Sequence, residues 1–123
     1  MPDNPPIAWF AKPEKHNYPA ALAYLSLLYK PSRAEKLVAK LHKSDIVHFK
    51  SKDIFRASSL PLLGISNMRI ASNNEKIKNG TSLSPLLLVR DSKNGKLIVA
   101  DGYHRLCTVY AIDQNAEIPC KIV

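Results

Sequence analysis

An apolar segment, a glycine and a second apolar-rich segment constrain this chain more than any other feature. Residues 97–100 (L-I-V-A) are typical of a buried strand, and residues 106–112 (L-C-T-V-Y-A-I) are typical of a helix. The residues between the two segments are Asp101, Gly102, Tyr103, His104 and Arg105. A strand, a glycine turn and a helix start together present backbone N–H groups to an anion. The sequence therefore predicts a phosphate-sized pocket at this turn.

Each residue of the turn has a predicted role in holding a phosphate. Gly102 would leave space for the phosphate to approach the backbone, and backbone N–H groups near Tyr103 and His104 would donate to it. The side chains of His104 and Arg105 would add charge-assisted donors. Tyr103 could also stack on a base or pack over the turn. The alternative is a structural turn in which Gly102 reverses the chain and Arg105 pairs with Asp101 or the C-terminus.

Asp101 has three interpretations. It could cap the following helix, hold a magnesium ion that bridges phosphates, or act catalytically as a base toward an attacking hydroxyl. Because an uncapped helix start is costly, capping is the first expectation. A zinc-type metal site is not expected, because His16, His42 and His48 are isolated in the sequence.

The charge balance points to an anionic partner. The chain has 18 Lys and Arg residues against 10 Asp and Glu, a formal net charge of +8, which suits nucleic acid, a nucleotide or an acidic partner. Helical spacing places one group of basic residues on one side of a helix, where they could follow a phosphate backbone: Arg33, Lys36, Lys40 and Lys43. No aromatic residue interleaves with them, so base stacking is not predicted. A solvated outer face is the alternative.

Periodicity and turn signals predict the order of the elements. A helix over residues 18–28 is followed by a second helix that Ser32 and Glu35 would open as a capping box, which makes a helical hairpin. The remaining predicted elements are an extended segment 46–49, a strand or turn 52–56, a loop 58–64, a helix 73–79 stopped by Gly80, strands 84–90 and 96–100 joined by the turn 91–95, a helix 103–113 and a last strand 118–123.

Together these elements predict an α+β fold with a small mixed sheet. One structural domain is expected: residues 1–52 form an arm and a basic helical hairpin packed on the body, and residues 53–123 form the core. The apolar runs are strand-length, so no membrane partner is expected. Because the first residues lack a secretory signal, a cytoplasmic location is predicted, with Cys107 and Cys120 as buried free thiols.

The second half of the chain resembles the ParB/sulfiredoxin superfamily. The resemblance covers roughly residues 53–123 and rests on the strand S-P-L-L-L-V, the turn I-V-A-D-G-Y-H-R and the final I-P-C-K-I-V, in that order. In this family, a G-x-x-R or G-x-H-R turn at a helix start holds nucleotide phosphates. The resemblance implies that Gly102, His104 and Arg105 bind phosphate, and that Arg56 faces the motif.

The same resemblance narrows the range of activities to be expected. Sulfiredoxins carry a reactive cysteine where this chain has Tyr103, so repair of sulfinic acids is not expected. Chromosome-partitioning members continue into a helix-turn-helix, whereas this chain ends at Val123, so centromere binding is not expected. Free-amino-acid kinases of the superfamily carry a D-G-H-H-R turn, close to the one here. Phosphoryl transfer or nucleotide hydrolysis with Mg²⁺ is therefore the expected chemistry if the protein is an enzyme. The other hypotheses are a nucleic-acid-binding or regulatory protein and a degenerate interaction module.

Overall fold

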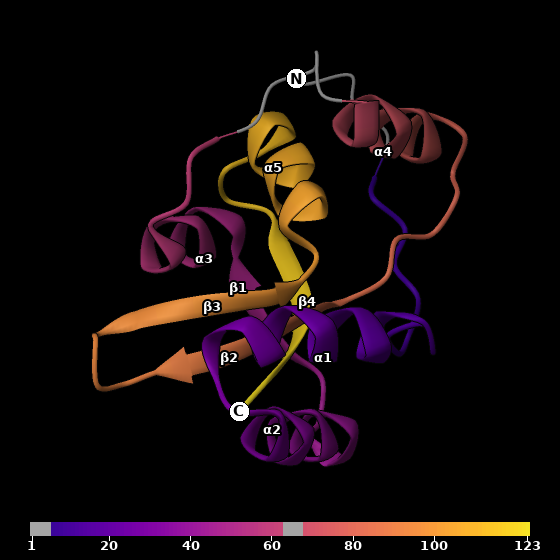
Figure 1. Ribbon diagram of the computed structural model, residues 1–123. Coiled ribbons are helices and arrows are strands. Elements are labelled where there is room, and N and C mark those ends of the chain that lie inside the picture. Colours follow the sequence, from indigo (N-terminus) through magenta and orange to yellow (C-terminus); the bar gives the residue numbers. More distant parts are fainter. Residues whose placement is uncertain (1–5, 63–67) are drawn as a thin grey trace.

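The fold is α+β, as the sequence predicts. The computed structural model describes residues 6–62 and 68–123, in which five helices pack on a four-stranded mixed sheet (Figure 1). The helices are α1 (Asn17–Leu28), α2 (Pro31–Lys43), α3 (Ser51–Ser58), α4 (Met68–Lys78) and α5 (Tyr103–Ile112), and the strands are β1 (Val47–Lys50), β2 (Leu86–Asp91), β3 (Lys96–Asp101) and β4 (Glu117–Ile122).

The sheet has the strand order β1-β4-β2-β3. β2 pairs antiparallel with β3 and parallel with β4, and β4 pairs antiparallel with β1. The predicted turn at residues 91–95 joins β2 to β3, with the side-chain amide of Asn94 donating to Asp91 at 2.8 Å and Gly95 at φ +63°. Because β1 comes from the first 52 residues, both halves of the chain contribute to one sheet.

Helices cover both faces of the sheet (Figure 1). Leu87 and Val89 of β2 pack in a cluster with residues of α1 and α2, whereas Leu86 and Leu88 pack with residues of α3, α4 and α5. Successive strand side chains point to opposite faces, so a strand covered on both sides needs an unbroken apolar run. The run L-L-L-V at 86–89 meets this requirement.

The two N-terminal helices differ in how their apolar residues are distributed. α1 is apolar on all sides: Ala21 and Leu25 are buried against the sheet, while Leu27 is 83% exposed and Leu28 is 50% exposed. α2 is amphipathic and buries one face through Ala34, Val38 and Leu41. The predicted hairpin is thus present, but its first helix keeps an apolar outer face.

Three local predictions are wrong. Residues 52–56 are helical within α3, because Ile54 and Ser58, four residues apart, both face the interior. No capping box opens α2: Pro31 takes the first helical position, Lys30 is the N-cap and no side chain caps the end. α4 begins at residue 68 rather than 73, although Gly80 follows its end with φ +72° as predicted. The end of the loop predicted over 58–64 lies outside the described residues.

The N-terminal segment packs beside Leu83, just before β2, through Trp9. Trp9 forms a β-bridge with Leu83, and the N–H of Phe10 donates to the Leu83 carbonyl at 2.9 Å. Phe10 itself remains 42% exposed. Both Cys107 and Cys120 are buried free thiols, which confirms that prediction. Within the described residues, no helix is long and apolar enough to cross a membrane.

Candidate functional site

The predicted turn lies where β3 meets α5. Gly102 is the residue before the helix and has a backbone φ of +113°, a conformation that residues other than glycine rarely adopt. A Cβ atom placed there would lie 2.7 Å from Cγ of Leu86 and 2.9 Å from Nη2 of Arg105. Glycine is therefore required at this position. The reason is the close approach of Leu86 and Arg105, and not the approach of a phosphate. The expected space for a phosphate on this side of Gly102 is taken by those two side chains.

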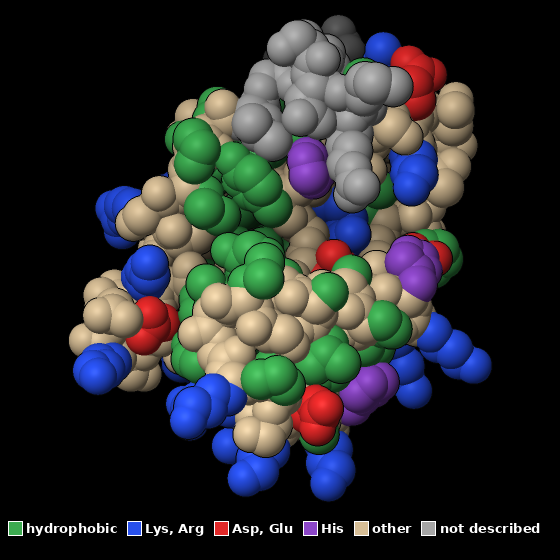
Figure 2. Space-filling view, in the orientation of Figure 1, with side chains coloured by type: hydrophobic (Ala, Val, Ile, Leu, Met, Phe, Trp, Pro, Cys, Tyr) green, Lys and Arg blue, Asp and Glu red, His purple; other side chains and the backbone are tan. Residues whose placement is uncertain are grey.

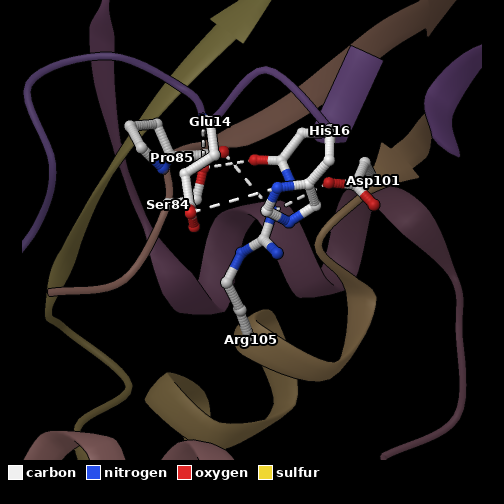
Figure 3. A network of polar contacts seen from close by, with 7 residues as sticks. Glu14, His16, Ser84, Pro85, Asp101 and Arg105 are labelled. Carbon is white, nitrogen blue, oxygen red and sulfur yellow. Dashed lines mark hydrogen bonds and ion pairs between the residues drawn. The ribbon is translucent and has the colours of Figure 1, made fainter. Parts of the chain in front are cut away.

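Arg105 is held inward by its neighbours (Figure 3). Its Nη2 lies 3.1 Å from Oδ2 of Asp101 and 3.5 Å from the carbonyl oxygen of Pro85. The side chains of Arg105 and Asp101 are only 16% and 19% exposed. The Nε atom of Arg105 is buried and has no hydrogen-bond partner. Arg105 thus has one charged partner and one unsatisfied donor.

Asp101 does not cap α5, so the capping interpretation is wrong. The N-cap residue of this helix is Gly102, which makes no side-chain capping hydrogen bond. The physical reason is position: Asp101 precedes the N-cap residue Gly102, and its carboxylate meets the guanidinium of Arg105 four residues later. The ion pair expected for a structural turn is present.

A polar network fixes the chain that leads to Pro85 (Figure 3). The backbone N–H of Glu14 donates to Oγ of Ser84 at 3.0 Å, and that hydroxyl donates to Oδ1 of Asn17. His16 lies beside Glu14, with 4.0 Å between Nδ1 and Oε2. The N-terminal segment thereby holds the residue next to Pro85, whose carbonyl contacts Arg105.

A polar cavity of about 260 Å³ opens between α4 and α5. Asp101, Gly102, His104 and Arg105 line one side of it. The other side comes from α4, through Ser72, Asn73 and Lys76. The exposed Lys76 adds a second full cation next to the one of Arg105, so the cavity combines two cations, one carboxylate and neutral donors.

The α4 residues are the part of the site that the sequence did not reveal. Ser72 and Lys76 are four residues apart and share a helix face, which is a visible signal. That signal does not say which element α4 packs against. Only the packing of α4 on α5 brings this face to the turn.

Two predicted phosphate-binding residues are not brought to the cavity. The hydroxyl of Tyr103 donates to the carbonyl of Pro61. Partial burial raises the pKa of Tyr103, and the nearby thiol of Cys107 raises this pKa further. Arg56 lies on α3, where its side chain is 88% exposed and 3.9 Å from Asp53. It lines a separate hollow next to Tyr110.

The predicted basic stripe lies on the outer face of α2. Its four residues are all exposed, opposite the buried residues Ala34, Val38 and Leu41. Figure 2 shows Lys and Arg side chains at the lower end of the molecule, where α2 lies in Figure 1. The guanidinium of Arg33 lies over the ring of Tyr29, 5.3 Å from its centre. The aromatic residue that neighbours the stripe, Tyr29, therefore comes from the residue that follows α1 and not from α2.

The described residues contain no group of three His, Cys, Asp or Glu side chains that could hold a metal ion. Asp101 is the one carboxylate among the described residues lining the α4–α5 cavity. Magnesium is commonly bound by one or two carboxylates together with substrate phosphates. A nucleotide and Asp101 together would satisfy this requirement, whereas Asp101 alone would not.

The chain matches no protein-family model, no curated protein and no solved structure. The resemblance to the ParB/sulfiredoxin superfamily therefore stays a prediction from the sequence.

Proposed function

We propose that this protein is a cytoplasmic binding protein for a nucleotide or another phosphate-bearing small molecule, which the α4–α5 cavity receives. The observation that carries the proposal is the buried Nε of Arg105, which lies in the first turn of α5 and lacks a hydrogen-bond partner among the described residues. Leaving such a donor unsatisfied costs about 1–3 kcal/mol. Because this atom is buried, a phosphate oxygen would accept its hydrogen bond only after the side chain of Arg105 turns toward the cavity, and it would then recover that free energy.

The surroundings of Arg105 suit a phosphate rather than a neutral ligand. Lys76 supplies a second cation from the opposite wall, and Ser72 and Asn73 supply neutral polar groups. Helix N-termini favour anions because their N–H groups and the helix dipole point the same way. A group with several acceptor oxygens and negative charge can use all of these donors at once.

Asp101 determines how the phosphate would bind. Its carboxylate already occupies Nη2 of Arg105 at 3.1 Å, so an anion must share that guanidinium or displace the carboxylate. A magnesium ion that accompanies a nucleotide would attract the carboxylate of Asp101 and release Arg105 toward the phosphates. Phosphoryl transfer or nucleotide hydrolysis would require this rearrangement, because Oδ2 of Asp101 contacts Arg105 instead of an attacking hydroxyl or water.

The test is thermal stabilisation by ATP, CTP, GTP and inorganic phosphate, each with and without Mg²⁺. A ligand that binds the native state raises the melting temperature by mass action. Lys76→Ala removes one of the two cations of the cavity, and Lys78→Ala is the matched control, since Lys78 lies on the same helix but pairs with Glu75 outside the cavity. We expect equal stabilisation of the wild type and Lys78→Ala and reduced stabilisation of Lys76→Ala. No stabilisation by any ligand, or equal stabilisation of all three proteins, would contradict the proposal.

Nucleic-acid binding at α2 is the second candidate, favoured by the exposure of its four basic residues on one face. Binding through phosphate contacts weakens steeply as salt rises. Charge reversal at Lys36 and Lys40 should then lower the affinity for an oligonucleotide and flatten its salt dependence. The α4–α5 proposal predicts no effect of these changes on stabilisation by nucleotides.

A further inference from the structure

A groove of about 550 Å³ runs along the open edge of β3. β3 is the last strand of the sheet, so no described strand lies beyond it. Four successive residues, 96–99, line the groove. Because alternate side chains of a strand point to opposite faces, a cavity lined by successive residues lies at the strand's edge and not over one face.

The walls of this groove come from the two helical layers. Tyr24 and Leu28 of α1 line one side, and Ser58 and Leu60, at the end of α3 and just beyond it, line the other. Tyr24 is 42% exposed and Leu28 is 50% exposed, and the apolar surface continues onto the more exposed Leu27. The groove thus offers an open strand edge between two walls that carry apolar side chains.

Positive charge surrounds the groove at its hairpin end. The cations that line it are Arg33, Arg90, Lys93 and Lys96. The single carboxylate among the described lining residues, Asp91, already accepts hydrogen bonds from Asn94. Figure 2 shows Lys and Arg side chains at the end of the molecule where Figure 1 places the β2–β3 turn.

We propose that this groove binds an extended acidic segment of another protein, which adds to the sheet as a strand beside β3. An open edge presents backbone N–H and C=O groups that an extended peptide can pair with, while pockets on either side select alternate side chains. The cations would pair with acidic side chains and the apolar walls would contact the residues between them. This surface is separate from the α4–α5 cavity, and the proposal does not depend on the proposed phosphate site.

Charge and surface chemistry favour this occupant over two others. A second copy of the chain would bring a net charge of +8 toward an already basic groove. A nucleic acid would satisfy the cations, but its phosphate backbone would leave the exposed Leu28 and the strand edge without partners. An acidic peptide uses all three features of the groove.

The test uses a short, capped, dye-labelled peptide in which valine and glutamate alternate. Two N-methylated forms of it differ only in which set of alternate residues carries the methyl groups. In strand addition, one set of peptide N–H groups faces β3 and the other faces solvent. We expect fluorescence anisotropy to show that the parent peptide binds, that one methylated form loses binding at least about tenfold, and that the other retains it. Equal binding by both methylated forms, or no binding by the parent peptide, would overturn strand addition.

A pair of charge-reversal variants tests whether the peptide binds in the groove along β3. Lys96→Glu changes a cation of the groove, and Lys36→Glu makes the same change of charge on α2, outside it. We expect about tenfold weaker peptide binding by Lys96→Glu and nearly unchanged binding by Lys36→Glu. Equal weakening by both variants would mean unspecific attraction and would overturn the proposal. It would also be overturned if an oligothymidine of matched charge displaced the peptide and bound more tightly.

Discussion

The α4–α5 cavity and the groove along β3 both carry positive charge, but they hold it in opposite ways. In the cavity, the side chain of Arg105 is only 16% exposed and is fixed by Asp101 and Pro85, although Lys76 on the other wall is exposed. In the groove, the side chains of Lys93 and Lys96 are exposed. A buried charge must be paired to be tolerated, whereas an exposed charge is solvated by water.

Because of this difference, substitutions should lower the stability of the protein more at the cavity than at the groove. Changes at the cavity disturb the packing of Gly102 and Leu86 as well as any ligand. Changes of exposed charges at the groove alter recognition while the fold stays nearly as stable. Binding and folding should therefore be coupled at the cavity and nearly independent at the groove.

Replacement of two of the positive-φ glycines, Gly102 and Gly95, should give the largest contrast in stability. Gly102→Ala would place a methyl group 2.7 Å from Leu86, so we expect the free energy of unfolding to fall by about 3 kcal/mol. Gly95, in the β2–β3 turn beside the groove, also has a positive φ, but a methyl group added there would meet nothing within 4 Å. Gly95→Ala should cost about 1 kcal/mol. Urea denaturation of both variants checks this, and equal losses would contradict the close packing at Gly102.

Removal of the carboxylate at the cavity should have opposite effects on folding and binding. Asp101→Asn leaves the guanidinium of Arg105 without its charged partner, so we expect a loss of about 2 kcal/mol in the free energy of unfolding. The same change frees Arg105, so the affinity for inorganic phosphate measured by calorimetry without Mg²⁺ should rise. Weaker phosphate binding by this variant would show that Asp101 does not compete for Arg105.

Alkaline pH should weaken the core beneath the cavity. Burial raises the pKa of Cys120 from 9.0 to about 12, and Cys120 pairs in register with Leu86, the neighbour of Gly102. The unfolded chain loses this thiol proton at a lower pH than the folded chain, so stability should fall as pH rises from about 9 toward 12. At about pH 10, the loss from this group is about 1 kcal/mol. Urea denaturation of Cys120→Ala across the same range should show a shallower decline, and identical slopes would contradict the burial.

The smallest effect on stability is expected at the groove. Lys96→Glu should change the free energy of unfolding by less than about 0.5 kcal/mol, because the lysine side chain is exposed and no ion pair of Lys96 is present among the described residues. Thermal denaturation of this variant next to Asp101→Asn makes the comparison direct. A loss at Lys96 as large as that at Asp101 would remove the distinction between the two regions.

The sequence predicted the elements best where local signals were strong and agreed. The Asn94-Gly95 turn and the apolar runs on either side of it indicated β2 and β3, and the structure confirms them. Residues 52–56 lacked such agreement: the segment is too short to show a clear period, and its helical form follows from burying Ile54 and Ser58 together. Ser51, which precedes it, is held by the carbonyls of residues 113 and 114, a contact that no local pattern reveals.

Only the part of the site that consists of sequence neighbours was predicted, because local signals do not reveal how distant elements pack. Gly102, His104 and Arg105 are neighbours in the sequence, so their proximity follows from one turn. Lys76 reaches them only through the packing of α4 on α5, and the tyrosine next to Arg33, Tyr29, comes from the residue that follows α1. Arg56 was placed by resemblance alone, and the structure puts it on another surface.

Titration of the protein with ATP and Mg²⁺, followed by the backbone amide signals in NMR spectra, tests the central claim most directly. If the α4–α5 cavity receives the phosphates, the amide signals of residues 72–76 and 103–105 should shift together, while those of α2 and residues 93–99 stay in place. The signals at the start of α5 should shift less in Lys76→Ala at the same nucleotide concentration. Shifts confined to α2 or to the β2–β3 hairpin, with α5 unchanged, would contradict the account.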